Sequence, residues 1–335
     1  MNHIAIDLGG SKSQVCVRNS VGEILEEVKI ETPKLKQYLK KQPHATVIME
    51  TCSESWKVGD LAKQAGHNVK VVPTYLVRSL GVGNRGIKND RKDAQALSEV
   101  STRIDLPSVH IRSVLSREIQ VELKLRGQLV GSRTQLINSV RGWMRTETIR
   151  IKSGVSHTFP QRLRKKEQSL PEYIDRQLDQ IAYLSESIQK ADQSLQQQAK
   201  KNANVVLLQS IPGIGVLTSL AFLSVVDTID RFKKAHHLES YLGLTPGERS
   251  SGKKIRTTSI TKAGSSMLRT LLVQAAWTLY VHRPNEPIVK WAKEIEERRG
   301  KKMAIVALAR KLTGICYAVW KTNTPYQSKR TVSES

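Results

Sequence analysis

The chain has 335 residues and carries 54 Lys and Arg against 30 Asp and Glu, so its formal net charge is +24. This length exceeds one small core and predicts two folded units joined by an extended connector. The charge favours a polyanionic partner, with nucleic acid as the first candidate. No apolar run reaches the roughly 18 to 20 residues that span a bilayer. The first residues enter a strand pattern directly, so we expect a cytoplasmic protein.

The three cysteines, Cys16, Cys52 and Cys316, have spacings that fit neither a zinc site nor a disulfide framework. The histidines form no metal-ligand spacing either. We therefore expect free thiols and no zinc site.

The first 105 residues alternate short apolar runs with turn signals and helical patterns. Strands are predicted at 3–8, 13–18, about 23–30, 45–49 and 68–72, and helices at 32–42, at 55–65 and from about Asp90. The order βββ-α-β-α-β-α is typical of ribonuclease-H-like α/β folds. We therefore predict a ribonuclease-H-like domain over residues 1–105.

Four carboxylates fall at related positions of this predicted domain. Asp7 ends the first strand, Glu50 ends the fourth, and Asp90 and Asp93 lie one turn apart at the start of the last helix. The first and fourth strands are expected to be parallel neighbours, so their ends share one edge of the sheet. Such convergence of charge is costly unless a cation neutralises it. Mg²⁺ prefers oxygen ligands, and one or two ions held there would serve phosphodiester chemistry.

Residues 106–203 predict a basic connector of long helices. Apolar residues at spacings of three and four run from Ile174 to Leu195, which indicates coiled-coil character. This stripe is too narrow for a globular core, so we expect it to pair with the 114–150 helix or with another subunit. Residues 112–166 hold thirteen Lys or Arg and three acids, which favours contact with phosphate groups.

A mostly helical domain is predicted over residues 204–322, followed by a polar tail at 323–335. It opens with Ser210-Ile211-Pro212-Gly213-Ile214-Gly215, which resembles the hairpin of helix-hairpin-helix modules. In such hairpins, glycines let backbone N–H groups approach a DNA phosphate. Gly213 and Gly215 are therefore candidate nucleic-acid-binding residues.

A basic segment farther along presents Ser251 beside Gly252, with Ser250 as the alternative hydroxyl. Nearby cations stabilise an alkoxide and the charge of a phosphoryl transition state, so Ser251 is a candidate nucleophile. By pattern alone Ser-Ser-Gly is also a common loop, and a purely structural role stays open. The candidate cations for nucleic-acid contact are Arg249, Lys253, Lys254, Arg256 and Lys262.

Several motifs, taken together, resemble one known family. They are Ala5-Ile6-Asp7, Met49-Glu50, Asp90-Arg91-Lys92-Asp93-Ala94, Ile211-Pro212-Gly213-Ile214-Gly215, Tyr241-Leu242-Gly243-Leu244, Ser251-Gly252, Ile260-Thr261-Lys262-Ala263-Gly264 and Leu268-Arg269. Over most of its length the chain resembles the bridge-RNA-guided transposases of the insertion-sequence family numbered one hundred and ten, which includes the Piv-type DNA invertases.

The resemblance implies a RuvC-like domain whose Asp-Glu-Asp-Asp tetrad falls on Asp7, Glu50, Asp90 and Asp93, and a transposase domain whose nucleophilic serine falls on Ser251. It also implies recombination of donor and target DNA, both recognised through a structured guide RNA. The site would be composite and assembled in a dimer or tetramer. Two alternatives stay open: a metal-dependent junction-resolving nuclease that uses only the tetrad and water, and a non-enzymatic RNA- or DNA-binding protein.

Overall fold

The computed structural model describes residues 1–79, 90–248 and 257–328. The chain divides into two compact units, Met1–Arg112 and Ser113–Ser335. The sequence predicts a first boundary near residue 105 and a separate connector up to 203. In the structure the long helices of that connector belong to the second unit, because their ends contribute side chains to its main core.

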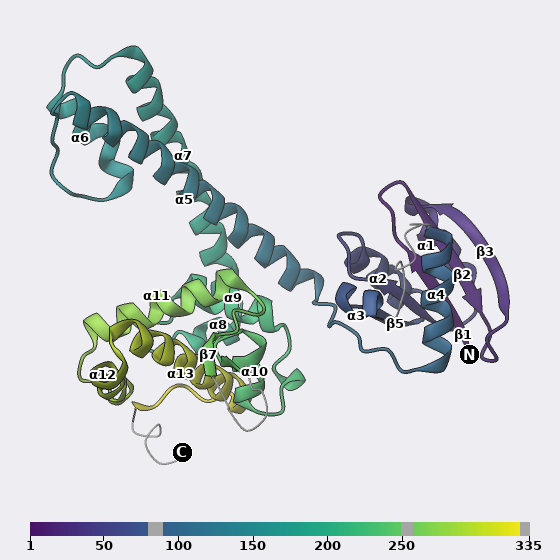
Figure 1. Cartoon of the computed structure of the whole chain (residues 1–335). Coiled ribbons are helices and arrows are strands. Elements are labelled where there is room, and N and C mark those ends of the chain that lie inside the picture. Colours follow the sequence, from purple (N-terminus) through teal and green to yellow (C-terminus); the bar gives the residue numbers. More distant parts are fainter. Residues whose placement is uncertain (80–89, 249–256, 329–335) are drawn as a thin grey trace. The chain divides into compact units, whose positions relative to one another are not determined.

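The first unit is built on a five-stranded sheet of order β3-β2-β1-β4-β5 (Figure 1). The strands β1, β2 and β3 form an antiparallel meander, and β4 and β5 run parallel to β1. The elements follow the predicted order, with one unpredicted short helix, α3, before the last one. The bounds are β1 (Asn2–Asp7), β2 (Lys12–Arg18), β3 (Ile24–Glu31), α1 (Leu35–Lys41), β4 (Ala45–Glu50), α2 (Ser55–Gln64), β5 (Asn68–Val72), α3 (Thr74–Ser79) and α4 (Asp90–Arg103).

Helices cover both faces of this sheet, which explains its nearly continuous apolar strands. Side chains alternate between faces along each strand. Ile4 and Ile6 belong to the core that includes residues of α1 and α2, whereas Ala5 and Ile48 belong to a second cluster with Leu97 of α4. The two faces therefore have separate cores, and α4 lies on the face of Ala5 and Ile48.

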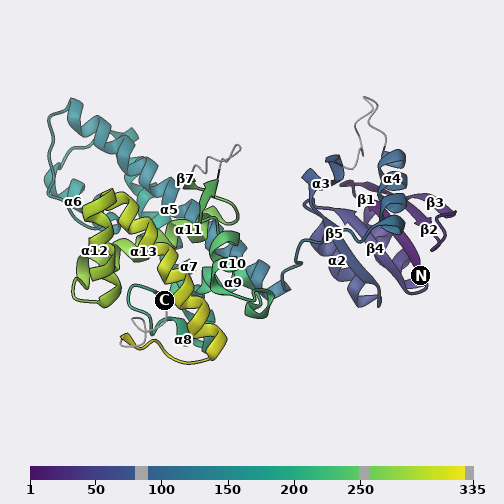
Figure 2. The same ribbon diagram turned by 60° about the horizontal axis from the view of Figure 1, so that its bottom comes forward.

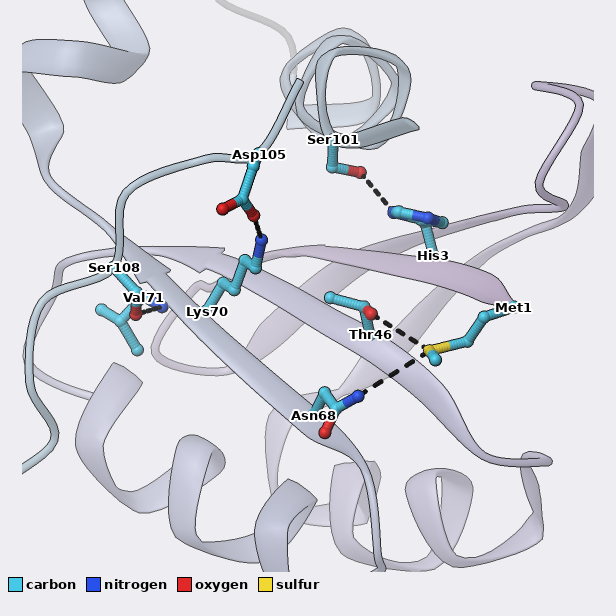
Figure 3. A network of polar contacts seen from close by, with 9 residues as sticks. All are labelled: Met1, His3, Thr46, Asn68, Lys70, Val71, Ser101, Asp105 and Ser108. Atoms are coloured by element: carbon cyan, nitrogen blue, oxygen red, sulfur yellow. Dashed lines mark hydrogen bonds and ion pairs between the residues drawn. The ribbon is translucent and has the colours of Figure 1, made fainter. Parts of the chain in front are cut away.

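The segment after α4 returns along the outer strand β5. The backbone N–H of Val71 donates to Ser108 Oγ at 3.0 Å, and Lys70 forms an ion pair with Asp105 (Figure 3). The backbone N–H of Val109 donates to the Val71 carbonyl at 2.7 Å. These bonds cover the edge of β5 and fix the end of α4 relative to the sheet.

The second unit, over its described residues, is helical apart from one small hairpin. Its elements are α5 (Val114–Thr146), α6 (Phe159–Lys166), α7 (Glu172–Lys200), α8 (Ala203–Leu208), α9 (Val216–Val226), α10 (Ala235–Tyr241), β6 (Pro246–Glu248), β7 (Thr257–Ile260), α11 (Ser266–His282), α12 (Pro287–Arg299) and α13 (Lys301–Thr322). The main core gathers apolar residues of α8 to α13, and α11, α12 and α13 lie side by side (Figures 1 and 2).

The apolar stripe predicted in α7 packs along α5 within the chain. Ile181 and Ile188 are buried in this seam, and the pairing is antiparallel because Leu195 lies with Leu123 whereas Ile181 lies with Ile137. Of the two predicted partners for the stripe, the 114–150 helix is therefore the one found.

One helix corrects an expectation. Among the described helices, α13 is long and apolar enough to cross a membrane by length and composition alone, although no such run was expected. Half of its most apolar window is buried, and Leu308, Leu312 and Cys316 lie in the main core. Packing thus accounts for its composition. Burial raises the pKa of the Cys316 thiol to about 12, and all three cysteines are free.

Candidate active site

The carboxyl ends of β1 and β4 bring two predicted ligands to one edge of the sheet. The strands are parallel, and Ile6 pairs with Met49, so the residues that follow, Asp7 and Glu50, end the two strands side by side. Strand alternation places Asp7 on the face of Ala5, and Glu50 on the same face. Both residues are half-buried. This is the face that α4 covers.

The helix α4 runs antiparallel to β1, with its first turn toward the same edge. At its far end, Ser101 Oγ lies 3.1 Å from His3 Nδ1 (Figure 3). Nearer the middle, Ser98 Oγ donates to Cys16 Sγ at 3.3 Å, and Cys16 pairs with Ala5. Four helical residues rise about 6 Å, close to the rise of two strand residues, about 6.6 Å.

This register extends to the third predicted ligand. Moving back four residues along α4 from Leu97 covers about the same distance as moving forward two residues along β1 from Ala5. Asp93 therefore lies level with Asp7. Asp90 is the first residue of α4 and lies about one turn beyond Asp93. The side chain of Asp90 falls outside the described part of the structure. The backbone therefore directs all four tetrad positions toward one edge.

Three of the four tetrad side chains, Asp7, Glu50 and Asp93, are described. Among the described side chains, which leave out Asp90, no three Asp, Glu, His or Cys lie close enough together to hold an ion. The donor set itself fits Mg²⁺, because carboxylate oxygens are the ligands that this ion prefers. The elements thus bring suitable donors to one place without closing a ligand shell.

Polar contacts with the meander hold the first half of α4. The Arg91 guanidinium bonds to the Glu27 carboxylate on β3, with Nε at 3.0 Å, and Gln95 donates to the same carboxylate. Arg18 Nε of β2 donates to Ser98 Oγ at 2.8 Å. The hydrogen bond from Arg91 lowers the pKa of Glu27. These bonds orient the turn of α4 that carries Asp93.

In the second unit, two glycine motifs interlock at the base of the β6–β7 hairpin. The Lys262 N–H donates to the Gly243 carbonyl at 3.1 Å. Gly243 and Gly264 both have positive φ, +68° and +66° respectively. A Cβ on Gly264 would overlap the Tyr241 carbonyl oxygen. Arg269 of α11 donates to the carbonyls of Leu242, at 3.1 Å, and Ala263.

We call this arrangement of Gly243, Gly264 and Arg269 the clasp. It lies at the base of the hairpin whose connecting segment carries the predicted nucleophile. Strands β6 and β7 pair through Pro246 with Ile260 and Glu248 with Thr257. Ser250, Ser251, Arg249, Lys253, Lys254 and Arg256 all lie outside the described residues. Lys262 is among the described residues. Its side chain is exposed beside the clasp, and its backbone has φ +56°.

The turn between α8 and α9 gives its two glycines different roles. Gly213 has φ +85°, and a Cβ there would meet the Ala275 carbonyl oxygen of α11 at 2.9 Å. Close packing against α11 therefore requires glycine at this position. Gly215 precedes α9 and faces open space, so its backbone is accessible to a ligand.

Family models and curated relatives cover both units. The model of the "Transposase IS116/IS110/IS902 family" matches residues 205–289, and a DEDD-type transposase model of the IS110 group matches residues 4–148. The transposase for insertion sequence element IS1111A of Coxiella burnetii is 30% identical over 97% of this chain and 91% of its own length. The chain belongs to the IS116/IS110/IS902 transposase family.

Other relatives also align along most of the chain. The transposase for insertion sequence element IS1328 of Yersinia enterocolitica is 26% identical over 96% of this chain and 98% of its own length. The pilin gene-inverting protein of Moraxella lacunata is 30% identical over 84% of this chain and 82% of its own length. As a member of the IS116/IS110/IS902 family the chain is a DNA transposase, and the DEDD-type match implies a ribonuclease-H-like first unit.

For this transposase, sequence reasoning missed the residues that position the site. Glu27 and Arg18, which orient α4, lie on strands far from it in sequence and have no motif. Gly243, Gly264 and Arg269 belong to the quoted motifs, but no role was assigned to them. The one signal in the sequence was that each of the two motifs, 241–244 and 260–264, contains a glycine, which allows two backbone segments to lie close together.

The ion pair between Glu27 and Arg91 predicts a pH-dependent contribution to stability. Because the pKa of Glu27 is lowered in the folded state, the contribution is complete above its ordinary value of 4.5 and is lost as pH falls through the lowered value. Glu27→Gln should reduce the unfolding free energy at pH 7 by about 0.5 to 1 kcal/mol. Urea unfolding at a series of pH values measures this difference, which should shrink below pH 4.5. A difference that persists unchanged in acid would contradict it.

The clasp makes a prediction with a matched control. Gly264→Ala adds an overlap with Tyr241 to the cost of positive φ, so it should destabilise the protein by about 2 to 5 kcal/mol. Gly66→Ala, at the end of α2, has φ +87° but open space around it, and should cost only about 1 to 2 kcal/mol. Thermal unfolding of both variants tests this difference. Equal losses of stability would show that the clasp is not tightly packed.

Proposed function

We propose that this transposase cuts and rejoins donor and target DNA through a composite site. Asp7, Glu50, Asp90 and Asp93 of the first unit would hold Mg²⁺, as one or two ions, and Ser251 of the second unit would attack the scissile phosphate. The observation that carries the proposal is the convergence of β1, β4 and the start of α4 at one sheet edge. The family membership supports the reaction class.

The carboxylates suit the part assigned to them. Adjacent negative charges at two strand ends repel each other, and a cation removes that cost. Bound Mg²⁺ would supply positive charge for the phosphate oxygens on which charge develops during cleavage. Glu27, Arg18 and Ser98 would keep the first half of α4, and with it Asp93, at the edge.

The assignment of Ser251 rests on the family resemblance and on the basic composition around it. Its Oγ would form a bond to phosphorus while the bond from phosphorus to one deoxyribose oxygen breaks, and the serine proton would end on that leaving oxygen. The resulting phosphoserine link keeps the bond energy, so rejoining needs no ATP. The clasp of Gly243, Gly264 and Arg269 would hold the base of this segment in place.

We propose further that a structured guide RNA reads both DNAs by base pairing, while the protein contacts backbone and shape. The net charge of +24 suits contacts with many phosphates. Gly215 and Lys262 offer exposed contact points among the described residues, and Gly213 would support its neighbour by packing on α11. Arg249, Lys253, Lys254 and Arg256 are the other proposed contacts. A cytoplasmic dimer or tetramer would allow Ser251 of one subunit to complete the acidic edge of another.

The nucleophile can be tested with DNA labelled at the scissile phosphate. Wild-type protein should form a labelled adduct on the peptide that contains Ser251. Ser251→Ala should abolish the adduct and strand exchange, because a methyl group cannot form the phosphoserine bond. Ser250→Ala is the matched control and should retain both, since losing a capping hydroxyl costs only about 0.5 to 2 kcal/mol.

Each other outcome selects a named alternative. An adduct lost only in Ser250→Ala would move the nucleophile by one residue. Mg²⁺-dependent cleavage without any adduct would support a nuclease that uses the tetrad and water. Binding without cleavage in every protein would leave a non-enzymatic nucleic-acid-binding role.

A further inference from the structure

The helices α5, α6 and α7 build a second, smaller core at one end of the second unit. Phe159 and Leu163 of α6 are fully buried there between Met144 of α5 and Leu178 of α7. We call residues 137–181, which contain this core, the hairpin tip. Figure 1 shows α6 beside the ends of α5 and α7 that lie farthest from α9 and α11. The tip therefore folds around its own apolar centre.

A stretch of the α5–α7 seam that belongs to neither core separates the tip from the main core, with Ile188 buried in it. Leu123 belongs to the main core and Ile137 to the tip, which is about 21 Å of helix at 1.5 Å per residue. Between them Arg126 Nε donates to Asp192 at 2.9 Å, and Arg133 donates to Ser185 at 3.3 Å. The tip is thus held well away from the main core.

The loop between α5 and α6 is held in a fixed shape. Arg162 of α6 donates to the carbonyls of Lys152 and Val155. A Cβ on Gly154 would lie 2.8 Å from the same guanidinium. The Ile149 N–H donates to the Met144 carbonyl at 2.8 Å, which folds the loop back on the end of α5. Lys152 is therefore fixed beside α6.

Exposed cations gather on this framework. Residues 141–166 include eight Lys or Arg and one acid, Glu147. Lys165 and Lys166 follow Arg162 by three and four residues, so they share its face of α6 and lie toward Lys152. Within residues 141–166, the exposed cations without a carboxylate partner are Arg141, Arg145, Arg150, Lys152, Lys165 and Lys166. Of these, Arg141 lies over the Phe159 ring.

Structural roles account for only part of this charge. Arg164 is satisfied by Asp175 and Asp179 of α7, with bonds of 2.8 and 2.6 Å. Lys165 and Lys166 lie at the C-terminal end of α6, where the helix dipole stabilises positive charge. No such role explains the loop cation Lys152, whose backbone is held in place while its side chain stays in solvent.

We propose that the hairpin tip is a docking surface for the phosphate backbone of duplex DNA, remote from the catalytic residues. A fixed array of unpaired cations suits a regularly spaced polyanion, because each contact releases condensed counterions. The partner is assigned to DNA because the chain is a DNA transposase. The proposal depends on that membership and not on Ser251, the tetrad or a guide RNA.

The test compares two triple variants of the full chain. Lys152, Lys165 and Lys166 are changed to Gln in the tip variant, and the control changes Lys190, Lys200 and Lys201, which are exposed and lie outside the hairpin tip, to Gln. Lys190 already pairs with Glu186. Binding to a duplex of about 30 base pairs is measured over a range of salt concentrations without Mg²⁺, with unfolding temperatures as a folding check.

The tip variant should lower the magnitude of the slope of log K against log salt by about 2.7, or about 0.9 for each lost phosphate contact. The control should change that slope by less than about 1. An unchanged slope in the tip variant, or an equal change in the control, would overturn the proposal. A loss confined to an RNA hairpin of similar size, with duplex DNA binding intact, would also overturn it. Since no cleavage is required, failure of the Ser251 assignment would leave this result unaffected.

Discussion

The parallel pairing of β1 with β4 is the constraint on which the rest of the site depends. It places Asp7 and Glu50 at neighbouring strand ends, where two negative charges lie close together. Such an arrangement costs free energy unless a cation or a cationic group compensates it. The antiparallel course of α4 across the same face then brings Asp93 to this edge.

The second unit supplies a different kind of order. Its clasp depends on two glycines with positive φ that let two backbone segments touch, and Arg269 bridges their carbonyls. A backbone-to-backbone contact of this kind fixes the ends of a hairpin without using the side chains between them. In a similar way, the small core of the hairpin tip fixes the backbone that carries the surface cations of the tip.

Much of the first unit could be predicted because its signals are local. The apolar runs that form β1 and β4 end at Asp7 and Glu50, and the pairing of these strands follows from the element order. The helix α3 was missed because Thr74–Ser79 is too short to show helical periodicity. The unit boundary was placed near 105, whereas the structure divides at 112, because Leu106 and Ile111 pack into the cores of the first unit.

The interactions that position the site were beyond reach of the sequence. Glu27 meets Arg91 across a separation of 64 residues, and no periodicity links them. The pairing of α7 with α5 was one of two expected outcomes, because an apolar stripe does not identify its partner. The convergence of the four tetrad carboxylates stays a prediction, because the side chain of Asp90 lies outside the described part of the structure.

We propose that the acidic edge of the first unit serves recombination through a bound divalent cation. The most direct measurement is DNA strand exchange as a function of Mg²⁺ concentration for wild type, Glu50→Gln and the control Glu54→Gln, with DNA affinity measured in parallel. Glu50→Gln should abolish exchange at every Mg²⁺ concentration while DNA affinity stays close to wild type, and Glu54→Gln should behave like wild type. Full Mg²⁺-dependent exchange by Glu50→Gln would contradict the account.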